Sequence, residues 1–198
     1  MPIDLADPTS VALLAASAFT SARIDHALYG GLLLAAYGRA RETRDADLAV
    51  LDVSAETARA ALASADVKAT VSFERVRFGG LTVSRIALLG GDDLNTVDLV
   101  RPVSDRYARI VLERSVQAPL REQTIRVVSP EDFVLLKALS TREADLDDAA
   151  SVLTRSSDAL DHALIEKEVR ELQAEMSDIS VHARWTSIQE RSKSGGVP

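Results

Sequence analysis

The amino-acid sequence predicts an α+β fold: a small mixed β-sheet flanked by helices and followed by a C-terminal helical section. Two regions of the chain lead to this fold class. Between residues 67 and 100, short apolar segments alternate with glycine pairs, which is typical of antiparallel strands joined by tight turns. From Ser129 onward the patterns are helical. The segment Ser-Pro-Glu-Asp starts a helix there, with serine as the N-cap, proline at the first helical position and acids in the first turn.

The same patterns divide the chain. We expect a core over residues 1–128, a helical section packed on it over 129–191, and a flexible tail over 192–198. In the core, helices are expected at residues 11–24, 32–37, 54–62 and 106–117, with Ser54 as the N-cap of the third. Strands are expected at residues 27–29, 45–51, 67–73, 75–78, 81–89, 95–100 and 123–128. The helical section should hold one helix from residue 130 and two more at 145–153 and 160–176.

The composition is that of an ordinary globular protein, but the charge is unevenly spread. Apolar residues make up 46% of the 198 residues and charged residues 27%. No apolar run approaches the roughly 20 residues that a membrane span requires, so no membrane partner is expected. The absence of cysteine excludes disulfides and thiolate metal sites and is compatible with a cytoplasmic location.

The net charge of −7 comes mainly from the C-terminal part. Residues 1–129 carry 15 Lys and Arg against 16 Asp and Glu, whereas residues 130–198 carry 8 against 14. A chain this acidic is not typical of proteins that bind nucleic acid tightly. The first part is nevertheless rich in arginine, so a local basic rim around a site remains compatible with the sequence.

Asp45 and Asp47 are the first candidates for chemistry. Two residues apart on a strand, their side chains project from the same face, while Ala46 and Leu48 project from the other. Adjacent carboxylates repel each other unless a cation lies between them, and hard oxygen ligands of this kind suit Mg²⁺. The alternative is a solvated strand end that happens to carry two acids.

Asp98 offers a third carboxylate, on a later strand. An acid on one strand face is usually just solvated. On a strand next to Asp45 and Asp47, however, it would complete a ligand set for one or two magnesium ions, as in phosphoryl transfer. The three aspartates together therefore predict a divalent-metal site.

Three further features could bind phosphate. Gly30-Gly31 follows a strand, and glycines there let backbone N–H groups approach a phosphate closely, although a structural tight turn explains the pair equally well. Arg39, Arg41 and Arg44 lie between this turn and the aspartates, where arginine forks could recognise phosphate or form a solvated loop. Lys137 interrupts an otherwise apolar helix, and its ammonium could reach a phosphate or extend to solvent.

Together these residues resemble the nucleotidyltransferase superfamily with the DNA polymerase beta-like fold. Its pattern is a strand, a G-G or G-S turn, a short helix, D-x-D on a second strand and a later single acid. The string G-G-x-x-L-x-x-x-G-x-x-R-x-T-x-D-x-D-L is similar to the abortive-infection, AbiEii-type branch, whose members include toxins of toxin–antitoxin systems. Gly38, Arg41 and Thr43 fit this string, and Leu34 departs from it by one position.

A second stretch, S-P-E-D-F-V-L-L-K-A-L-S-T-R-E-A-D-L-D-D, resembles the helical motif of that branch. It supplies matches at Lys137, Arg142, Asp145 and Asp148, so the resemblance covers about residues 25–155. Two departures concern the turn. Gly31 stands where some members have a serine hydroxyl, and the bulky residues 32–34 predict a narrower pocket.

The resemblance implies a nucleotidyltransferase core and a role for each matching residue. Asp45, Asp47 and Asp98 would be the catalytic carboxylates and would bind Mg²⁺ or Mn²⁺. The nucleotide-binding residues would be Gly30, Gly31, Arg41, Thr43 and Lys137, with Arg39 and Asp145 in support.

The implied reaction transfers a nucleoside monophosphate from an NTP to an acceptor and releases pyrophosphate. The first acceptor to consider is RNA, such as a tRNA end, in a toxin that has a cognate antitoxin as partner. A small hydroxylated molecule such as an aminoglycoside is the enzymatic alternative. A non-catalytic module that binds a nucleotide or a partner protein is a third hypothesis, against which the retention of all three acids argues.

Overall fold

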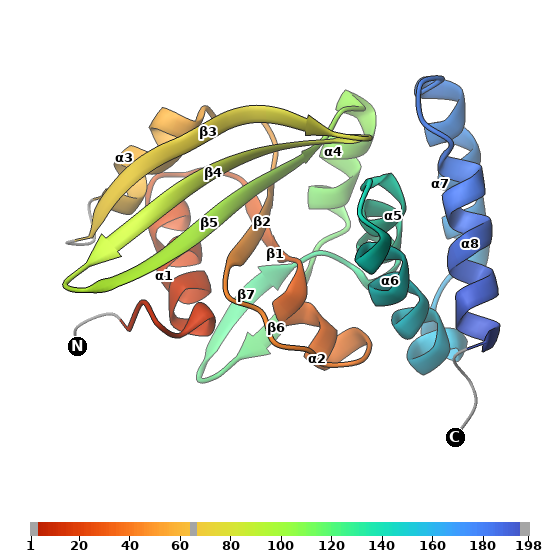
Figure 1. The fold of residues 1–198 in the computed structure, drawn as a ribbon, viewed down its shortest axis with the longest axis horizontal. Helices are drawn as coiled ribbons and strands as arrows, with labels where there is room; N and C mark the ends of the chain where they lie inside the picture. Colours follow the sequence, from red (N-terminus) through yellow and green to blue (C-terminus); the bar gives the residue numbers. More distant parts are fainter. Residues whose placement is uncertain (1–3, 64–66, 195–198) are drawn as a thin grey trace.

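The computed structural model of the chain describes residues 4–63 and 67–194. These residues form eight α-helices, two short 3-10 turns and one seven-stranded mixed sheet, which confirms the predicted α+β class (Figure 1). The strands are β1 (His26–Tyr29), β2 (Ala46–Val50), β3 (Lys68–Phe78), β4 (Leu81–Gly90), β5 (Asp93–Pro102), β6 (Val116–Leu120) and β7 (Gln123–Val127). The helices are α1 (Pro8–Ser21), α2 (Leu34–Tyr37), α3 (Ala55–Ala63), α4 (Asp105–Glu113), α5 (Pro130–Leu139), α6 (Glu143–Ser156), α7 (His162–Glu175) and α8 (Val181–Ser194), with 3-10 turns at Gly31–Leu33 and Ser157–Ala159.

The sheet has the strand order β3-β4-β5-β2-β1-β7-β6. Two of its six pairings are parallel: β2 pairs with β5, and β1 pairs with β7. The other four pairings are antiparallel. The three long strands β3 to β5 form a curved extension on one side of the molecule (Figure 1). Irregular pairing in the middle of β3, where Arg75 has a φ of 51°, contributes to that curvature because bulges increase local bending.

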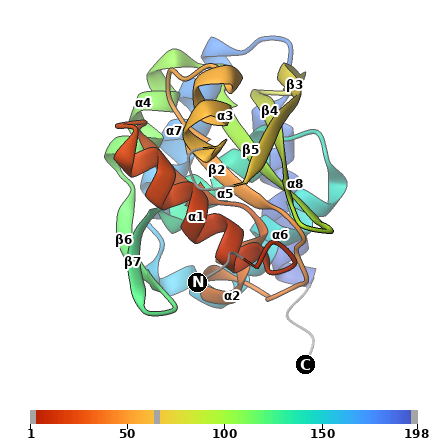
Figure 2. The ribbon, with the colours of Figure 1, turned by 90° about the vertical axis from the view of Figure 1, so that its left-hand side faces the viewer.

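One face of the curved extension is covered and the other is open. Helices α1 and α3 pack against the sheet on one side (Figure 2). Alternation along β4 and β5 places Ile86, Leu88 and Val97 on a fully buried face. Val83 and Arg85, which alternate with them, are only partly buried. The open face therefore presents side chains from three strands to a space in front of the sheet.

Helix α5 is the centre of the C-terminal section. Its residues from Asp132 to Leu139 are all buried, which explains why the sequence pattern there is apolar all round. Helices α6, α7 and α8 pack against it, and Phe133 also lies 5.6 Å from the ring of Tyr29 at the end of β1. The start of α5 is tied to α4, since Asp132 accepts hydrogen bonds from Tyr107 and Arg114.

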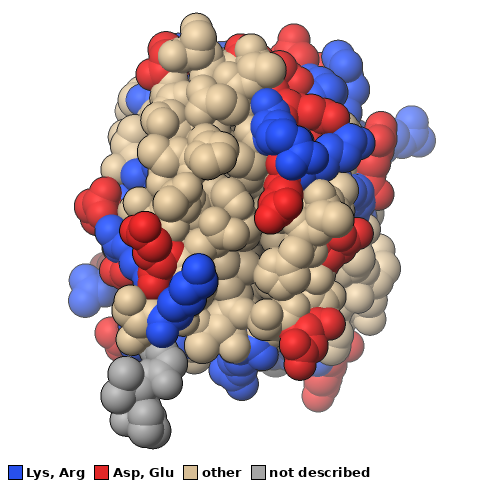
Figure 3. All heavy atoms as spheres, turned by 90° about the vertical axis from the view of Figure 1, so that its right-hand side faces the viewer, with Lys and Arg blue, Asp and Glu red and all other residues tan. Residues whose placement is uncertain are grey.

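The helices α7 and α8 form the outer side of this section. Uncharged residues cover much of that side of the molecule, and cationic and anionic groups lie mixed around them (Figure 3). This side therefore presents no continuous basic surface. Among the described residues, none of the helices is both long and apolar enough to cross a membrane.

Most expected elements are present, with four differences. The segments 67–73 and 75–78 are one strand, β3, which continues through its bulge. The helix expected over 106–117 ends at Glu113, and its last residues belong to strand β6, which pairs with β7 as a hairpin. Helix α8 was not expected at all. It runs to Ser194, into the segment expected as a tail, whereas residues 195–198 lie outside the described residues.

Candidate metal centre and nucleotide cavity

The three predicted aspartates come together where the start of β2 lies beside the middle of β5. Asp45 immediately precedes β2, Asp47 lies within it, and Asp98 lies opposite Asp47 in the parallel pairing of β2 with β5. One carboxylate oxygen from each aspartate lies within 4.8 Å of the others. Thr43 orients the first of them by donating a hydrogen bond to Asp45 Oδ1 at 3.1 Å. This is the ligand set that the sequence predicts, built from two neighbouring strands.

Gly30 and Gly31 are required by the close approach of acidic and hydroxyl side chains. Gly30 has a φ of 79°, and a Cβ there would lie 1.9 Å from Asp47 Oδ2. A Cβ on Gly31 would lie 2.7 Å from Thr43 Oγ1. The helices that follow are a single 3-10 turn and the four-residue α2, so a helix dipole contributes little here. The glycine pair thus makes room for the side chains of Asp47 and Thr43.

Burial and repulsion change the acidity of the central carboxylate. Burial raises the pKa of Asp47 to about 7, and the neighbouring charges of Asp45 and Asp98 act in the same direction, against the opposite effect of Lys137. Three carboxylates this close together also give the site an excess of negative charge. A divalent cation would relieve that excess, and hard carboxylate oxygens suit Mg²⁺ or Mn²⁺. The residues therefore fit the divalent metal that the fold implies.

Arg85 of β4 is the one cation paired directly with these acids among the described residues. It lies opposite Asp98 in the β4–β5 pairing. Its Nε and Nη2 donate to the two oxygens of Asp98, both at 2.7 Å, and Nη2 lies 3.6 Å from Asp45 Oδ2. The guanidinium also lies over the ring of Phe73, 5.7 Å from its centre. Sequence reasoning missed this residue, because its pairing depends on the strand register.

Lys137 belongs to a second charged cluster. Only 4% exposed, it donates to Asp145 at 2.6 Å and to Asp148 at 3.0 Å, and lies 5.5 Å from the ring centre of Tyr29. Arg41 forms a two-pronged ion pair with Asp148 at 3.1 and 3.2 Å. Burial raises the pKa of Asp148, but the hydrogen bonds from Arg41 and Lys137 outweigh it and leave that pKa lowered.

This cluster excludes one of the two alternatives for Lys137, because its ammonium does not extend to solvent. Asp145 and Asp148 both accept hydrogen bonds from Lys137, and Ser140 also donates to Asp145. Asp147, between them in sequence, is the exposed one and pairs with Arg191 of α8.

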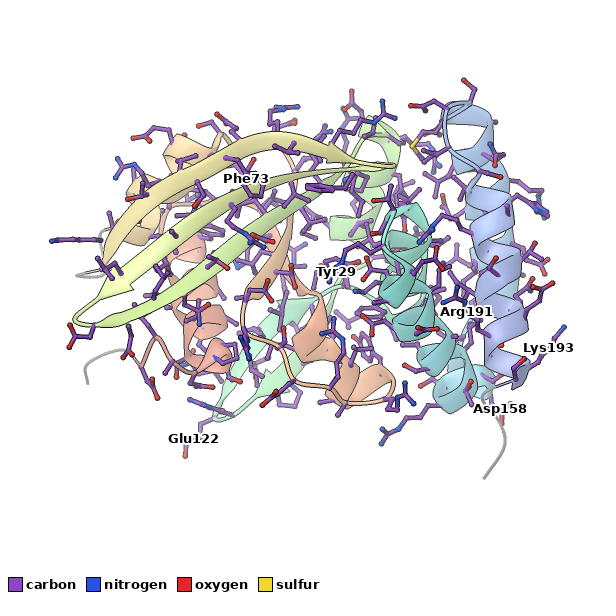
Figure 4. All side chains as sticks on the ribbon, in the orientation of Figure 1. Tyr29, Phe73, Glu122, Asp158, Arg191 and Lys193 are labelled. Carbon is purple, nitrogen blue, oxygen red and sulfur yellow. The ribbon has the colours of Figure 1, made fainter. Side chains whose placement is uncertain are left out.

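A cavity of about 550 Å³ connects the two clusters. Figure 4 labels two of its lining residues, Phe73 on the curved extension and Tyr29 at the end of β1 beside α5. The open face of β3 and β4 contributes an apolar wall that includes Phe73, Phe78 and Val83. Arg44 and Arg142 also line the cavity, are exposed, and have no ion-pair partner among the described residues.

Most of the predicted site residues line this cavity: Gly31, Arg41, Thr43, Asp45, Asp47, Asp98, Lys137 and Asp145. Gly30 lies behind it, against Asp47. Arg39 does not join the site. Its backbone N–H donates to Ser151, and its side chain lines a separate hollow beside α6 and α8. The three leucines after the turn face the core rather than the cavity, so they do not narrow it.

Comparison with known proteins identifies the family. A model of the family described as "Nucleotidyl transferase of unknown function (DUF2204)" matches residues 12–184. The chain belongs to this family. No curated protein matches it in sequence.

The search of solved structures returned nucleotidyltransferase-like proteins. An antigenic nucleotidyltransferase-like protein from Paracoccidioides brasiliensis has a TM-score of 0.51 at 18% identity, with 96% of this chain and 95% of that one covered. A nucleotidyltransferase described as putative, from H. pylori, has a TM-score of 0.49 at 13% identity, with 92% of each chain covered. The first of these likenesses supports the fold, and the chemistry has to be argued from the site.

Proposed function

We propose that this chain is a divalent-metal-dependent nucleotidyltransferase, which transfers a nucleoside monophosphate from an NTP to an acceptor hydroxyl and releases pyrophosphate. One observation carries the proposal: carboxylate oxygens of Asp45, Asp47 and Asp98 lie within 4.8 Å of one another in a cavity that is also lined by arginines. Membership of a nucleotidyltransferase family supports it independently.

The acids have distinct roles in this reaction. Asp45, Asp47 and Asp98 would hold Mg²⁺ or Mn²⁺, which supplies charge stabilisation for the attacking and leaving oxygens. The acceptor oxygen forms a bond to the α-phosphorus, and the bond to the bridging α,β oxygen breaks. Pyrophosphate leaves with that bonding pair, and Asp98 would accept the hydroxyl proton, which is the role that the resemblance to nucleotidyltransferases implies for the later single acid.

Cationic residues would hold the polyphosphate. Arg44 and Arg142 are exposed and without ion-pair partners among the described residues, so their guanidinium groups are available to an anion. Arg41 and Lys137 are already paired with carboxylates and would add positive charge to the wall. The apolar wall of Phe73, Phe78 and Val83 is suited to the base, because aromatic faces stack on bases of any kind.

Transfer of label tests this function directly. The protein is incubated with each α-³²P-labelled NTP and Mg²⁺ or Mn²⁺, and separately with tRNA, an aminoglycoside panel and cell lysate. We expect label in one acceptor fraction, and a loss of at least about a hundredfold in Asp47→Asn and in Asp98→Asn. Asp147→Asn is the matched control, since that acid is exposed and outside the cavity. Equal transfer by all three variants would refute the assignment, and label in no fraction would favour the binding-module hypothesis.

For the acceptor we propose RNA, with a tRNA end as the first substrate to test and a toxin role as the consequence. The arginine-rich first part of the chain supports a polyanionic acceptor, since residues 1–129 carry 15 Lys and Arg. A toxin would arrest growth on expression, and Asp45→Ala would abolish the arrest. A cognate antitoxin would then be a partner that relieves it.

A small hydroxylated molecule is the second candidate acceptor. The net charge of −7 favours it over a long nucleic acid. Label in the aminoglycoside fraction without growth arrest would decide for this candidate.

A further inference from the structure

Asp98 already has a cationic partner at the oxygens that a metal would use. Arg85 donates to both of its carboxylate oxygens at 2.7 Å, with the two-pronged geometry that makes guanidinium–carboxylate pairs strong. The same guanidinium lies 3.6 Å from Asp45 Oδ2. Arg85 therefore bridges two of the three proposed metal ligands, and a metal ion and this guanidinium compete for the same oxygens.

Arg85 is also partly exposed. Its side chain is 36% exposed, and among the described residues its guanidinium forms ion pairs with Asp98 and Asp45 alone and lies over the ring of Phe73. Lys137 is the contrast, because its ammonium is buried between two carboxylates and two aromatic rings. Moving Lys137 would leave buried charges unpaired, whereas Arg85 can leave Asp98 and remain in contact with solvent.

A released Arg85 would stay within the cavity. It lines the same space as Arg44 and Arg142, which have no ion-pair partners among the described residues. A guanidinium that loses one anionic partner there is placed to bind another, and the polyphosphate of a nucleotide is an anion of the right kind. Arg85 would thus exchange a carboxylate for a phosphate while Asp98 exchanges the guanidinium for a metal ion.

We propose that Arg85 is the exchangeable counter-ion of the metal centre: it holds Asp98 in the metal-free protein and transfers to the nucleotide's phosphates when a divalent cation binds. This inference rests on the metal site of the proposed function. It assigns Arg85 a positioning role. It also implies that, without nucleotide, the protein binds a divalent cation more weakly than it would if Arg85 were absent and the three carboxylates were unpaired. The alternative is a permanent brace that keeps Asp98 oriented whether or not metal is bound.

Binding of Mn²⁺ alone, followed by electron paramagnetic resonance, separates the two roles without using turnover. The variants are Arg85→Met, Arg85→Lys and, as a control for the loss of one cavity charge, Arg44→Met. An exchangeable Arg85 predicts that Arg85→Met binds Mn²⁺ roughly tenfold more tightly than wild type, whereas Arg44→Met gains less than about threefold. Arg85→Lys retains the charge without the two-pronged geometry and should lie between them.

A second measurement tests the phosphate contact. In the presence of saturating Mn²⁺, we expect α,β-methylene ATP to bind roughly tenfold more weakly to Arg85→Met than to wild type, because the guanidinium that would contact the phosphates is gone. The affinities for metal and nucleotide would then change in opposite directions. If Arg85 only keeps Asp98 oriented, its replacement by methionine should lower the affinities for both metal and nucleotide.

The outcomes are distinct. Mn²⁺ affinity in Arg85→Met that is equal to or below wild type, or a gain matched by Arg44→Met, would overturn the exchange. If Arg85→Met did not fold, as judged by circular dichroism, Arg85→Lys would decide. Exchange requires this variant to bind Mn²⁺ a few fold more tightly than wild type. Absence of Mn²⁺ binding in every variant, wild type included, would overturn the metal site of the proposed function and the exchange with it. Tight Mn²⁺ binding without nucleotidyl transfer would leave the exchange standing and refute only the reaction.

Discussion

The cavity brings together two acidic clusters that differ in charge balance. In the metal-site cluster, Asp45, Asp47 and Asp98 face a single directly paired cation, Arg85, among the described residues. Three carboxylates against one guanidinium leave an excess of negative charge. The pKa of Asp47 is raised to about 7, first by burial, and the charges of the other two acids add to that shift.

The lysine cluster is balanced. Here Asp145 and Asp148 face Lys137 and Arg41, so two acids meet two cations, and the pKa of Asp148 is lowered rather than raised. This difference in charge balance distinguishes a cluster that binds a ligand from one that stabilises the fold. Acids whose charge is compensated within the chain hold the fold together, whereas acids whose charge is not compensated require something from outside it.

The largest effect should come from breaking the balanced cluster. Lys137→Met leaves two buried carboxylates with one cation, and we expect it to lower the free energy of unfolding by about 3–5 kcal/mol. Denaturant unfolding measures this loss. Adding Asp145→Asn to Lys137→Met restores the balance, since Arg41 and Asp148 remain paired, and should recover part of the stability. A double variant no more stable than the single one would contradict the argument.

In the metal-site cluster, removing a charge should stabilise the protein rather than destabilise it. Asp47 has a folded-state pKa of about 7 against an ordinary 3.8, so between about pH 4 and pH 7 the unfolded chain binds fewer protons at this group. The free energy of unfolding of the metal-free protein therefore falls as the pH rises through this window. Asp47→Asn should remove that loss and stabilise the metal-free protein by about 2 kcal/mol at pH 8, and by much less at pH 5. Thermal unfolding of both proteins in EDTA checks the prediction, and a variant less stable than wild type at pH 8 would refute it.

A smaller effect is expected from adding metal to the unmodified protein. Mg²⁺ binds ionised carboxylates, so it should raise the midpoint of thermal unfolding more at pH 8 than at pH 6, where Asp47 is largely protonated. At ten times the dissociation constant the stabilisation would be about 1.4 kcal/mol. Asp98→Asn should lose it and Asp147→Asn should keep it. Equal stabilisation of both variants would show that Mg²⁺ binds elsewhere.

The parts of the site that were predictable depend on local sequence. Gly30-Gly31 and the spacing of Asp45 and Asp47 need only the geometry of one turn and one strand. The start of α5 follows from the capping serine, whose hydroxyl accepts the backbone N–H of Asp132. Each of these signals lies within a few residues.

The parts that were missed depend on partners distant in sequence. Arg85 becomes a site residue only when the register of β4 with β5 places it opposite Asp98, and a sequence alone does not fix that register. Strand β6 contains Pro119, which a sequence pattern counts against a strand but which an edge strand accepts. Helix α8 did carry a local signal, since Val181, Trp185 and Ile188 share one buried face, but its many polar residues obscured it.

Gly30 carries a packing constraint of its own, separate from any contact that its backbone makes with a nucleotide. Its missing side chain leaves space for the carboxylate of Asp47. Any side chain at this position would have to displace that carboxylate. A mutational survey would therefore rank Gly30 with the acids of the proposed metal site.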